Sequence, residues 1–80
     1  MKIVYTVKAT GQLKKLSPPE LKKVIKKIQT LEITALEGKK LGGKFAGLRS
    51  IRAWPYRIIY FLSSETITID KIEHRQGVYK

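Results

Sequence analysis

Hydrophobic and polar residues change their spacing along the chain, and this spacing predicts the order of the secondary-structure elements. Residues 2–7 alternate and are rich in β-branched and aromatic side chains, which is typical of a strand. Residues 9–16 predict a short helix, with Leu13 and Leu16 three positions apart. Three later segments return to a strand pattern and are separated by the turn signals WP and SSE: 48–54, 56–62 and 66–72.

The longest periodic segment lies between the first strand and the last three, and it predicts an amphipathic helix that ends near Leu36. Ser17 is a suitable N-cap, Pro18 suits the first helical position, and Glu20 supplies the second half of a capping box. The apolar positions follow helical spacing: Leu21, Val24, Ile25, Ile28 and Leu31. The opposite face carries four lysines: Lys22, Lys23, Lys26 and Lys27.

These elements predict one small α+β domain over residues 1–80, in the order β-α-α-β-β-β. Short connections between the last three strands indicate an antiparallel meander. We therefore expect a twisted antiparallel sheet with the two N-terminal helices packed on one face. The glycine-rich connection, residues 37–47, does not match the spacing of a phosphate loop. Both faces of residues 56–62 are largely apolar, so the second face is predicted to be a groove or a partner surface.

Composition narrows the class of partner. The 80 residues carry 17 Lys and Arg against 6 Asp and Glu, a formal net charge of +11. Such a charge favours a polyanionic partner, either nucleic acid or an acidic protein, over a merely solvated lysine-rich surface. No signal peptide or membrane span is visible, so the expected location is cytoplasmic. One histidine and no cysteine argue against a metal site.

The residues suited to phosphate chemistry cluster in the predicted meander. Arg52 should face Arg57 across a hairpin, and Arg75, at the end of the third strand, should approach Arg57. Three guanidiniums without a carboxylate between them suggest that a phosphate supplies the missing charge. The alternative is a set of solvated arginines on a rim. His74 and Tyr79 have structural alternatives too, as a surface histidine and a C-terminal anchor, although a tyrosine ring can also stack on a base.

Residues 41–80 resemble the C-terminal half of the RelE/ParE toxin superfamily of bacterial and archaeal toxin–antitoxin modules. The resemblance is carried by an ordered set of motifs, namely L-x-G, GLRSIR, YRIIY and HRxxVY. The first half of the chain agrees in layout, with one strand and two helices.

In the RelE branch, the resemblance implies cleavage of messenger RNA in the ribosomal A site, with the 2′-hydroxyl of the substrate as nucleophile and no cofactor. Arg57 would contact the scissile phosphate, and Arg75 would do likewise or assist the leaving oxygen. Tyr79 would stack on or orient a base. Arg52 matches the last basic residue of the preceding strand. The other basic position of that strand is occupied by Ser50 in this chain, so the resemblance does not identify the general base. His74 is a candidate for that role.

Two other functions remain open from the sequence. The ParE branch shares the fold and poisons DNA gyrase without cutting RNA, and a basic RNA-binding domain without chemistry is a third possibility. The expected partners are an acidic antitoxin, the ribosome and messenger RNA, with no membrane and no small-molecule cofactor. The antitoxin is expected to contribute an amphipathic helix or an added strand.

Overall fold

The computed structural model describes residues 2–34, 39–40 and 47–74, and within them it confirms the predicted order of helices and long strands. Between the helices and the meander it adds a two-residue strand, β2. The elements are β1 (Lys2–Tyr5), α1 (Val7–Lys14), α2 (Pro18–Thr34), β2 (Lys39–Lys40), β3 (Leu48–Ala53), β4 (Tyr56–Ser63) and β5 (Thr66–His74). The rest of the glycine-rich connection lies largely outside the described residues. Within these described ranges, neither helix is long and apolar enough to cross a membrane.

The strands form one sheet in the order β1-β5-β4-β3-β2. Strands β3, β4 and β5 make the predicted antiparallel meander, and β2 also pairs antiparallel with β3. The first strand differs, because β1 runs parallel to β5, with Ile3 opposite Ile67. The expectation of a wholly antiparallel sheet is therefore wrong at β1, and the sheet is mixed. No hairpin links β1 to β5, so the connection does not force antiparallel pairing.

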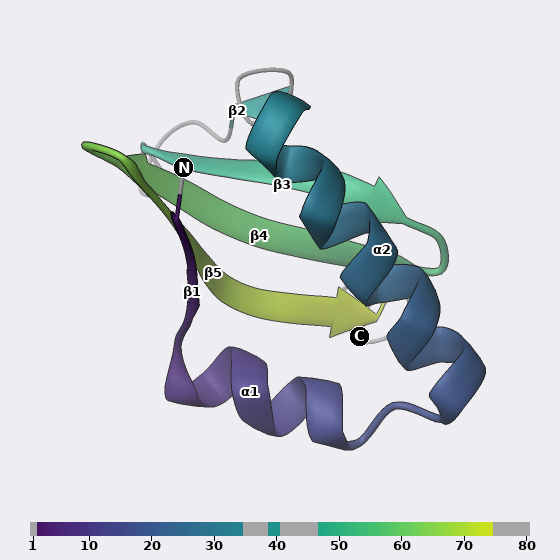
Figure 1. Ribbon diagram of the computed structural model, residues 1–80. Coiled ribbons are helices and arrows are strands. Elements are labelled where there is room, and N and C mark those ends of the chain that lie inside the picture. Colours follow the sequence, from purple (N-terminus) through teal and green to yellow (C-terminus); the bar gives the residue numbers. More distant parts are fainter. Residues whose placement is uncertain (1, 35–38, 41–46, 75–80) are drawn as a thin grey trace.

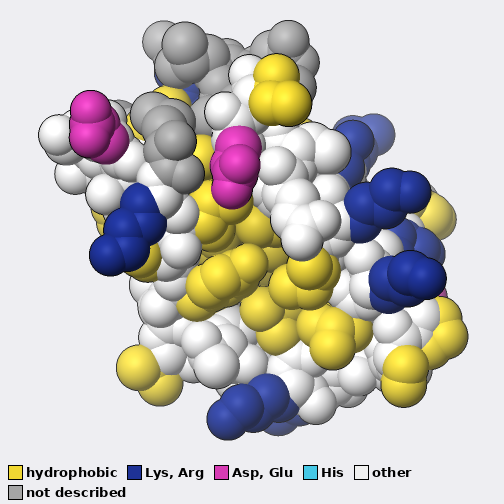
Figure 2. Space-filling view, in the orientation of Figure 1, with side chains coloured by type: hydrophobic (Ala, Val, Ile, Leu, Met, Phe, Trp, Pro, Cys, Tyr) yellow, Lys and Arg dark blue, Asp and Glu magenta, His cyan; other side chains and the backbone are white. Residues whose placement is uncertain are grey.

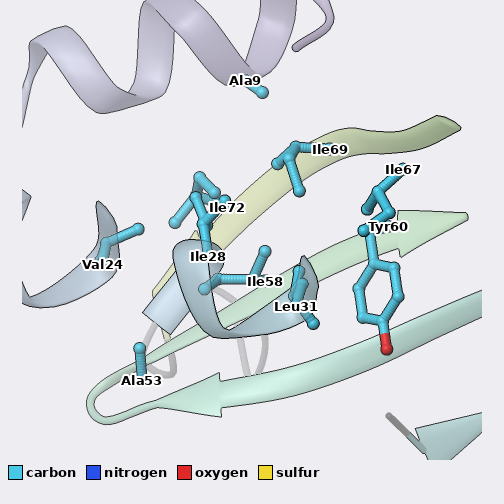
Figure 3. Packing of buried hydrophobic residues seen from close by; sticks show 10 residues of the cluster. All are labelled: Ala9, Val24, Ile28, Leu31, Ala53, Ile58, Tyr60, Ile67, Ile69 and Ile72. Carbon is cyan, nitrogen blue, oxygen red and sulfur yellow. The ribbon is translucent and has the colours of Figure 1, made fainter. Parts of the chain in front are cut away.

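Both helices cover the same face of the sheet, as predicted (Figure 1). One cluster of buried side chains joins the two layers (Figure 3). The helices contribute Ala9, Val24, Ile28 and Leu31, and the strands contribute Ala53, Ile58, Tyr60, Ile67, Ile69 and Ile72. The apolar stripe predicted for α2 thus faces the sheet, and the adjacent Leu21 and Ile25 are half-buried.

The start of α2 is held from two directions. The backbone N–H of Leu21 donates to the Ser17 carbonyl at 2.8 Å, which closes the first turn after Pro18. Glu20 forms an ion pair with Lys23 at 3.5 Å rather than the predicted capping-box bond to Ser17. Lys23 also donates to the carbonyl of Trp54 at 3.0 Å, which ties α2 to the turn between β3 and β4.

Helix α1 begins two residues earlier than predicted because Thr6 caps it. The Thr6 hydroxyl accepts from the N–H of Ala9 at 3.0 Å and donates to the carbonyl of Asp70 at 2.6 Å. Further along α1, Gln12 Oε1 accepts from the N–H of Ile72 at 2.6 Å. Strand β1 ends opposite Ile69 and leaves the next backbone groups of β5 without a strand partner. The side chains of Thr6 and Gln12 provide hydrogen bonds to two of these groups, the Asp70 carbonyl and the Ile72 N–H.

Candidate functional site

The register of β3, β4 and β5 gathers charged side chains at the end of the sheet that contains the β3–β4 turn. Arg52 lies opposite Arg57 across β3 and β4, as the sequence predicted. Arg57 in turn lies opposite Glu73 across β4 and β5. Their neighbours in sequence, Ala53 and Ile58, belong to the helix-side core, so Arg52, Arg57 and its partner Glu73 point to the opposite face.

A carboxylate lies directly beside the central arginine. Arg57 Nη2 is 3.3 Å from Glu73 Oε1, and Lys71 Nζ is 3.6 Å from Glu73 Oε2. The expectation that no carboxylate lies between the guanidiniums is therefore wrong. We call the group Arg52, Arg57, Lys71 and Glu73 the arginine face. Its three cations and one anion leave a net charge of +2, which still favours an anionic ligand.

A β-bulge in β5 places Lys71 and Glu73 on this face. Ile59 pairs with Lys71 while the next residue, Tyr60, pairs with Ile69, so Asp70 is an extra residue on β5. A bulge shifts the alternation of side chains by one position. Without it, Lys71 and Glu73 would share a face with Ile69 and point into the helix-side core. The charged pair therefore depends on this local irregularity.

His74 follows Glu73 but lies on the helix side of the sheet. It pairs with Tyr56 across β4 and β5, and the two rings meet edge to face with centroids 5.1 Å apart. Burial raises the pKa of the Tyr56 hydroxyl, and the charge of the Glu20 carboxylate raises it further. The structure thus separates His74 from Arg57 by the thickness of the sheet.

Comparison with known proteins decides the family. A family model described as the ParE toxin of the type II toxin–antitoxin system parDE matches residues 3–79. The chain belongs to the RelE/ParE toxin superfamily. It is therefore a toxin of a type II toxin–antitoxin system. A comparison with curated proteins finds no match.

Solved structures from both branches share the fold of this toxin. The RelBE2 toxin–antitoxin complex of Mycobacterium tuberculosis contains a chain with 31% identity and a TM-score of 0.85, and the match covers 92% of this chain and 90% of that one. A chain of the archaeal RelE–RelB complex of Pyrococcus horikoshii has 21% identity and a TM-score of 0.77, and the match covers 92% of this chain and 93% of that one. A chain of the chromosomal ParDE system of P. aeruginosa has 18% identity and a TM-score of 0.72, and the match covers 92% of this chain and 95% of that one.

The structure of the toxin brings together some of the predicted site residues and separates others. Arg52 is exposed and Arg57 is half-buried, and both lie on the arginine face. His74 lies on the other face, whereas Arg75 and Tyr79 lie outside the described residues. Ser50, the predicted departure from the family pattern, is buried on the same side of the sheet as the arginine face, opposite Ile59.

Sequence reasoning missed Lys71 and Glu73 as members of the site. The signal that could have found them is the spacing of the isoleucines in β5. Ile67 and Ile69 are two apart, but Ile72 follows after three. An apolar stripe that gains one residue within a strand indicates a bulge, and a bulge moves the polar residues that follow it to the other face.

The arginine face is suited to bind and stabilise charge rather than to supply a nucleophile. Guanidinium groups present N–H donors in a planar fork that matches phosphate oxygens. Lys71 adds a point charge within reach of the same anion. Among the described residues, no three His, Asp or Glu side chains form a group that could hold a metal ion.

Proposed function

We propose that this toxin is a ribosome-dependent endoribonuclease that cleaves messenger RNA in the A site and thereby inhibits translation. The observation that carries the proposal is the placement of Arg52 opposite Arg57 on the face of the sheet not covered by helices. Two guanidiniums on adjacent strands suit a phosphodiester that passes across the strands. The YR motif of the RelE resemblance contains Arg57, and by the same resemblance Arg75 of HRxxVY would contact the phosphate as well.

The proposed reaction needs charge stabilisation and proton transfer only. The 2′-hydroxyl of the substrate attacks the adjacent phosphorus, so an O2′–P bond forms and the P–O5′ bond breaks. The hydroxyl proton passes to a base, and the leaving O5′ takes up a proton. Arg57 would stabilise the charge that develops on the phosphate oxygens, with Arg52 beside it. Arg75 would assist there or at the leaving oxygen, and Tyr79 would stack on a base.

The proposed mechanism also needs a proton acceptor, and the arginines of the arginine face are poor bases. Among the candidate site residues, His74 has the side-chain type that most often serves as a general base. Its ring packs against Tyr56 on the helix side, so a role as base requires the substrate to pass around the end of β5. We keep His74 as the proposed base, and its substitution is a direct test.

The proposed protein partner is an acidic antitoxin. RelE–RelB and RelBE2 relatives have been crystallised as toxin–antitoxin complexes. On this chain, hydrophobic side chains gather between α1 and α2, with Lys and Arg side chains beside them (Figure 2). An acidic amphipathic helix would cover the apolar strip and neutralise part of the charge of +11. Association should then be fast and should slow as salt is added.

A second function, inhibition of DNA gyrase without RNA cleavage, is favoured by one observation. The family model that matches nearly the whole chain is that of the ParE toxin. Gyrase inhibition requires a binding surface but no reacting phosphate. The arginine face would then bind protein or DNA rather than stabilise a transition state.

One paired experiment separates the two functions. The toxin is added to an in vitro translation reaction, and primer extension maps breaks in the message. In parallel, gyrase supercoils plasmid DNA with and without the toxin. We expect ribosome-dependent breaks at A-site codons and normal supercoiling. Intact message together with blocked supercoiling would replace the nuclease proposal with the gyrase one.

A further inference from the structure

Glu73 forms ion pairs with two cations of the arginine face at once. Its Oε1 is 3.3 Å from Arg57 Nη2, and its Oε2 is 3.6 Å from Lys71 Nζ. The side chains of Arg57 and Glu73 are 39% and 26% exposed, so the pair is partly shielded from water. In the part of the chain that the structure describes, no ion pair is shown for Arg52, which is exposed beside this pair.

The Glu73 carboxylate contacts the guanidinium of Arg57 through one oxygen, and a ligand phosphate could compete for the same donor. A carboxylate and a phosphodiester both offer two anionic oxygens, and a guanidinium binds either by the same fork of donors. Arg57 uses Nη2 for Glu73, while its Nε is buried and has no hydrogen-bond partner among the described atoms. Arg57 therefore cannot present its whole fork to a ligand in this arrangement. A ligand phosphate must draw the guanidinium away from Glu73.

We propose that Glu73 is an internal counter-ion that holds Arg57 and Lys71 in the free toxin and that a phosphodiester of bound RNA displaces. The inference rests on the proposed function, which supplies the phosphate. Glu73 is a positioning residue in this scheme, because it acts through Arg57 and never contacts the reacting atoms. Removing its charge should strengthen the binding of a phosphate ligand.

The size of the effect follows from the exposure of the pair. Partly exposed ion pairs contribute little to stability, because water and salt screen them. Glu73 therefore tunes affinity and does not block the site. Replacing it with Gln should tighten RNA binding by about two- to fivefold, the range that such pairs represent.

The test measures the Kd of a short single-stranded RNA in which every 2′-hydroxyl is a 2′-O-methyl group, so that it cannot be cleaved. We expect Glu73→Gln to lower the Kd about two- to fivefold relative to the wild-type toxin. The matched control is Glu65→Gln, which makes the same change in net charge. Glu65 is exposed in the β4–β5 turn, at the opposite end of β4 from Arg57. Its effect should be clearly smaller, and equal effects of the two variants would overturn the inference.

A double-mutant cycle separates action through Arg57 from a general charge effect. In an Arg57→Ala background, Glu73→Gln should tighten RNA binding less than it does in the wild-type background. An undiminished gain would overturn the role of Arg57 as the group that Glu73 holds. The cycle needs no catalysis, so it remains informative if the toxin cuts no message and the nuclease proposal fails.

Cleavage on the ribosome gives a further discriminating measurement. The counter-ion role predicts that Glu73→Gln lowers KM and leaves kcat within about threefold, because the interaction with Glu73 is lost before the transition state. A large loss of kcat with unchanged RNA affinity would instead show that Glu73 transfers a proton. That result would overturn the counter-ion role while leaving the nuclease proposal intact.

Discussion

Glu73 and His74 are consecutive residues of β5, and their side chains lie on opposite faces of the sheet. Glu73 forms an ion pair with Arg57 on the face opposite the helices. His74 packs edge to face against Tyr56 on the helix side. Two groups that could accept a proton are thus adjacent in sequence but separated in space, and only the carboxylate contacts an arginine proposed to hold the substrate.

Replacing Arg57 with Ala should slow cleavage of ribosome-bound message by ~10²–10³, the range seen when one preorganised charge-stabilising donor is lost. Arg75→Ala should have an effect of the same order if it also contacts the phosphate. Primer extension at timed intervals gives the rate, and circular dichroism checks the fold. Lys26→Ala, on the exposed face of α2, removes the same charge and should leave the rate nearly unchanged. If Arg57→Ala cuts like Lys26→Ala, Arg57 is only part of a basic surface.

Replacing His74 with Gln tests whether this side chain is the base. His74 is the proposed base, so removing its imidazole should abolish the pH dependence of cleavage near neutrality, and an unchanged profile would remove His74 from the mechanism. Rates measured from pH 6 to pH 8 on one ribosome preparation provide the profile. A profile that becomes flat in the variant would identify His74 as the proton acceptor and would require a path for the substrate around the end of β5.

Replacing Gln12 with Ala should lower the free energy of unfolding by about 1–3 kcal/mol, because the partly buried N–H of Ile72 loses its acceptor. Urea denaturation of both proteins gives the difference. Gln29→Ala is the matched control, since Gln29 is exposed on α2. Equal stabilities of the two variants would mean that water replaces Gln12 at the β5 edge without cost.

Two isoleucines of α2 should differ sharply in their tolerance of truncation. Ile28 is fully buried between α2 and the sheet, so Ile28→Ala should lower the free energy of unfolding by about 2–5 kcal/mol. Ile33 lies on the same helix but is 90% exposed, and Ile33→Ala should change stability by less than about 0.5 kcal/mol. Chemical denaturation measures both. A large loss in Ile33→Ala would show that this side chain is covered in solution.

The pKa of Tyr56 should fall toward its usual value of 10.0 in a Glu20→Gln variant but should stay above it, because burial is the larger cause of the shift. The raised pKa means that folding favours the neutral phenol. That contribution to stability is complete below pH 10 and is lost as the pH rises through the folded value. Carbon NMR of labelled tyrosine ring carbons follows the titration. Glu32→Gln, a change of an exposed glutamate on the same helix, should leave Tyr56 unaffected.

The sequence by itself determined the elements and the side of α2 that is buried. The spacing of Val24, Ile28 and Leu31 is helical, and such a stripe is stable only against another apolar surface. The alternation in residues 48–72 likewise fixed three strands joined by short turns, and therefore the meander and the pairing of Arg52 with Arg57. These features follow from local periodicity and from connection length, which a single sequence displays directly.

Only the tertiary structure decided which edge β1 joins and at which residue the bulge indicated by the isoleucine spacing lies. Parallel pairing of β1 with β5 joins the first strand to the last, and no local pattern encodes that contact. Distant residues bind β5 at the bulge, since the Thr6 hydroxyl donates to the Asp70 carbonyl and Gln12 Oε1 accepts from the Ile72 N–H. A one-residue shift in a strand moves every later side chain to the other face of the sheet. The contact between Arg57 and Glu73 therefore requires the bulge as well as the pairing of the strands that carry the two residues.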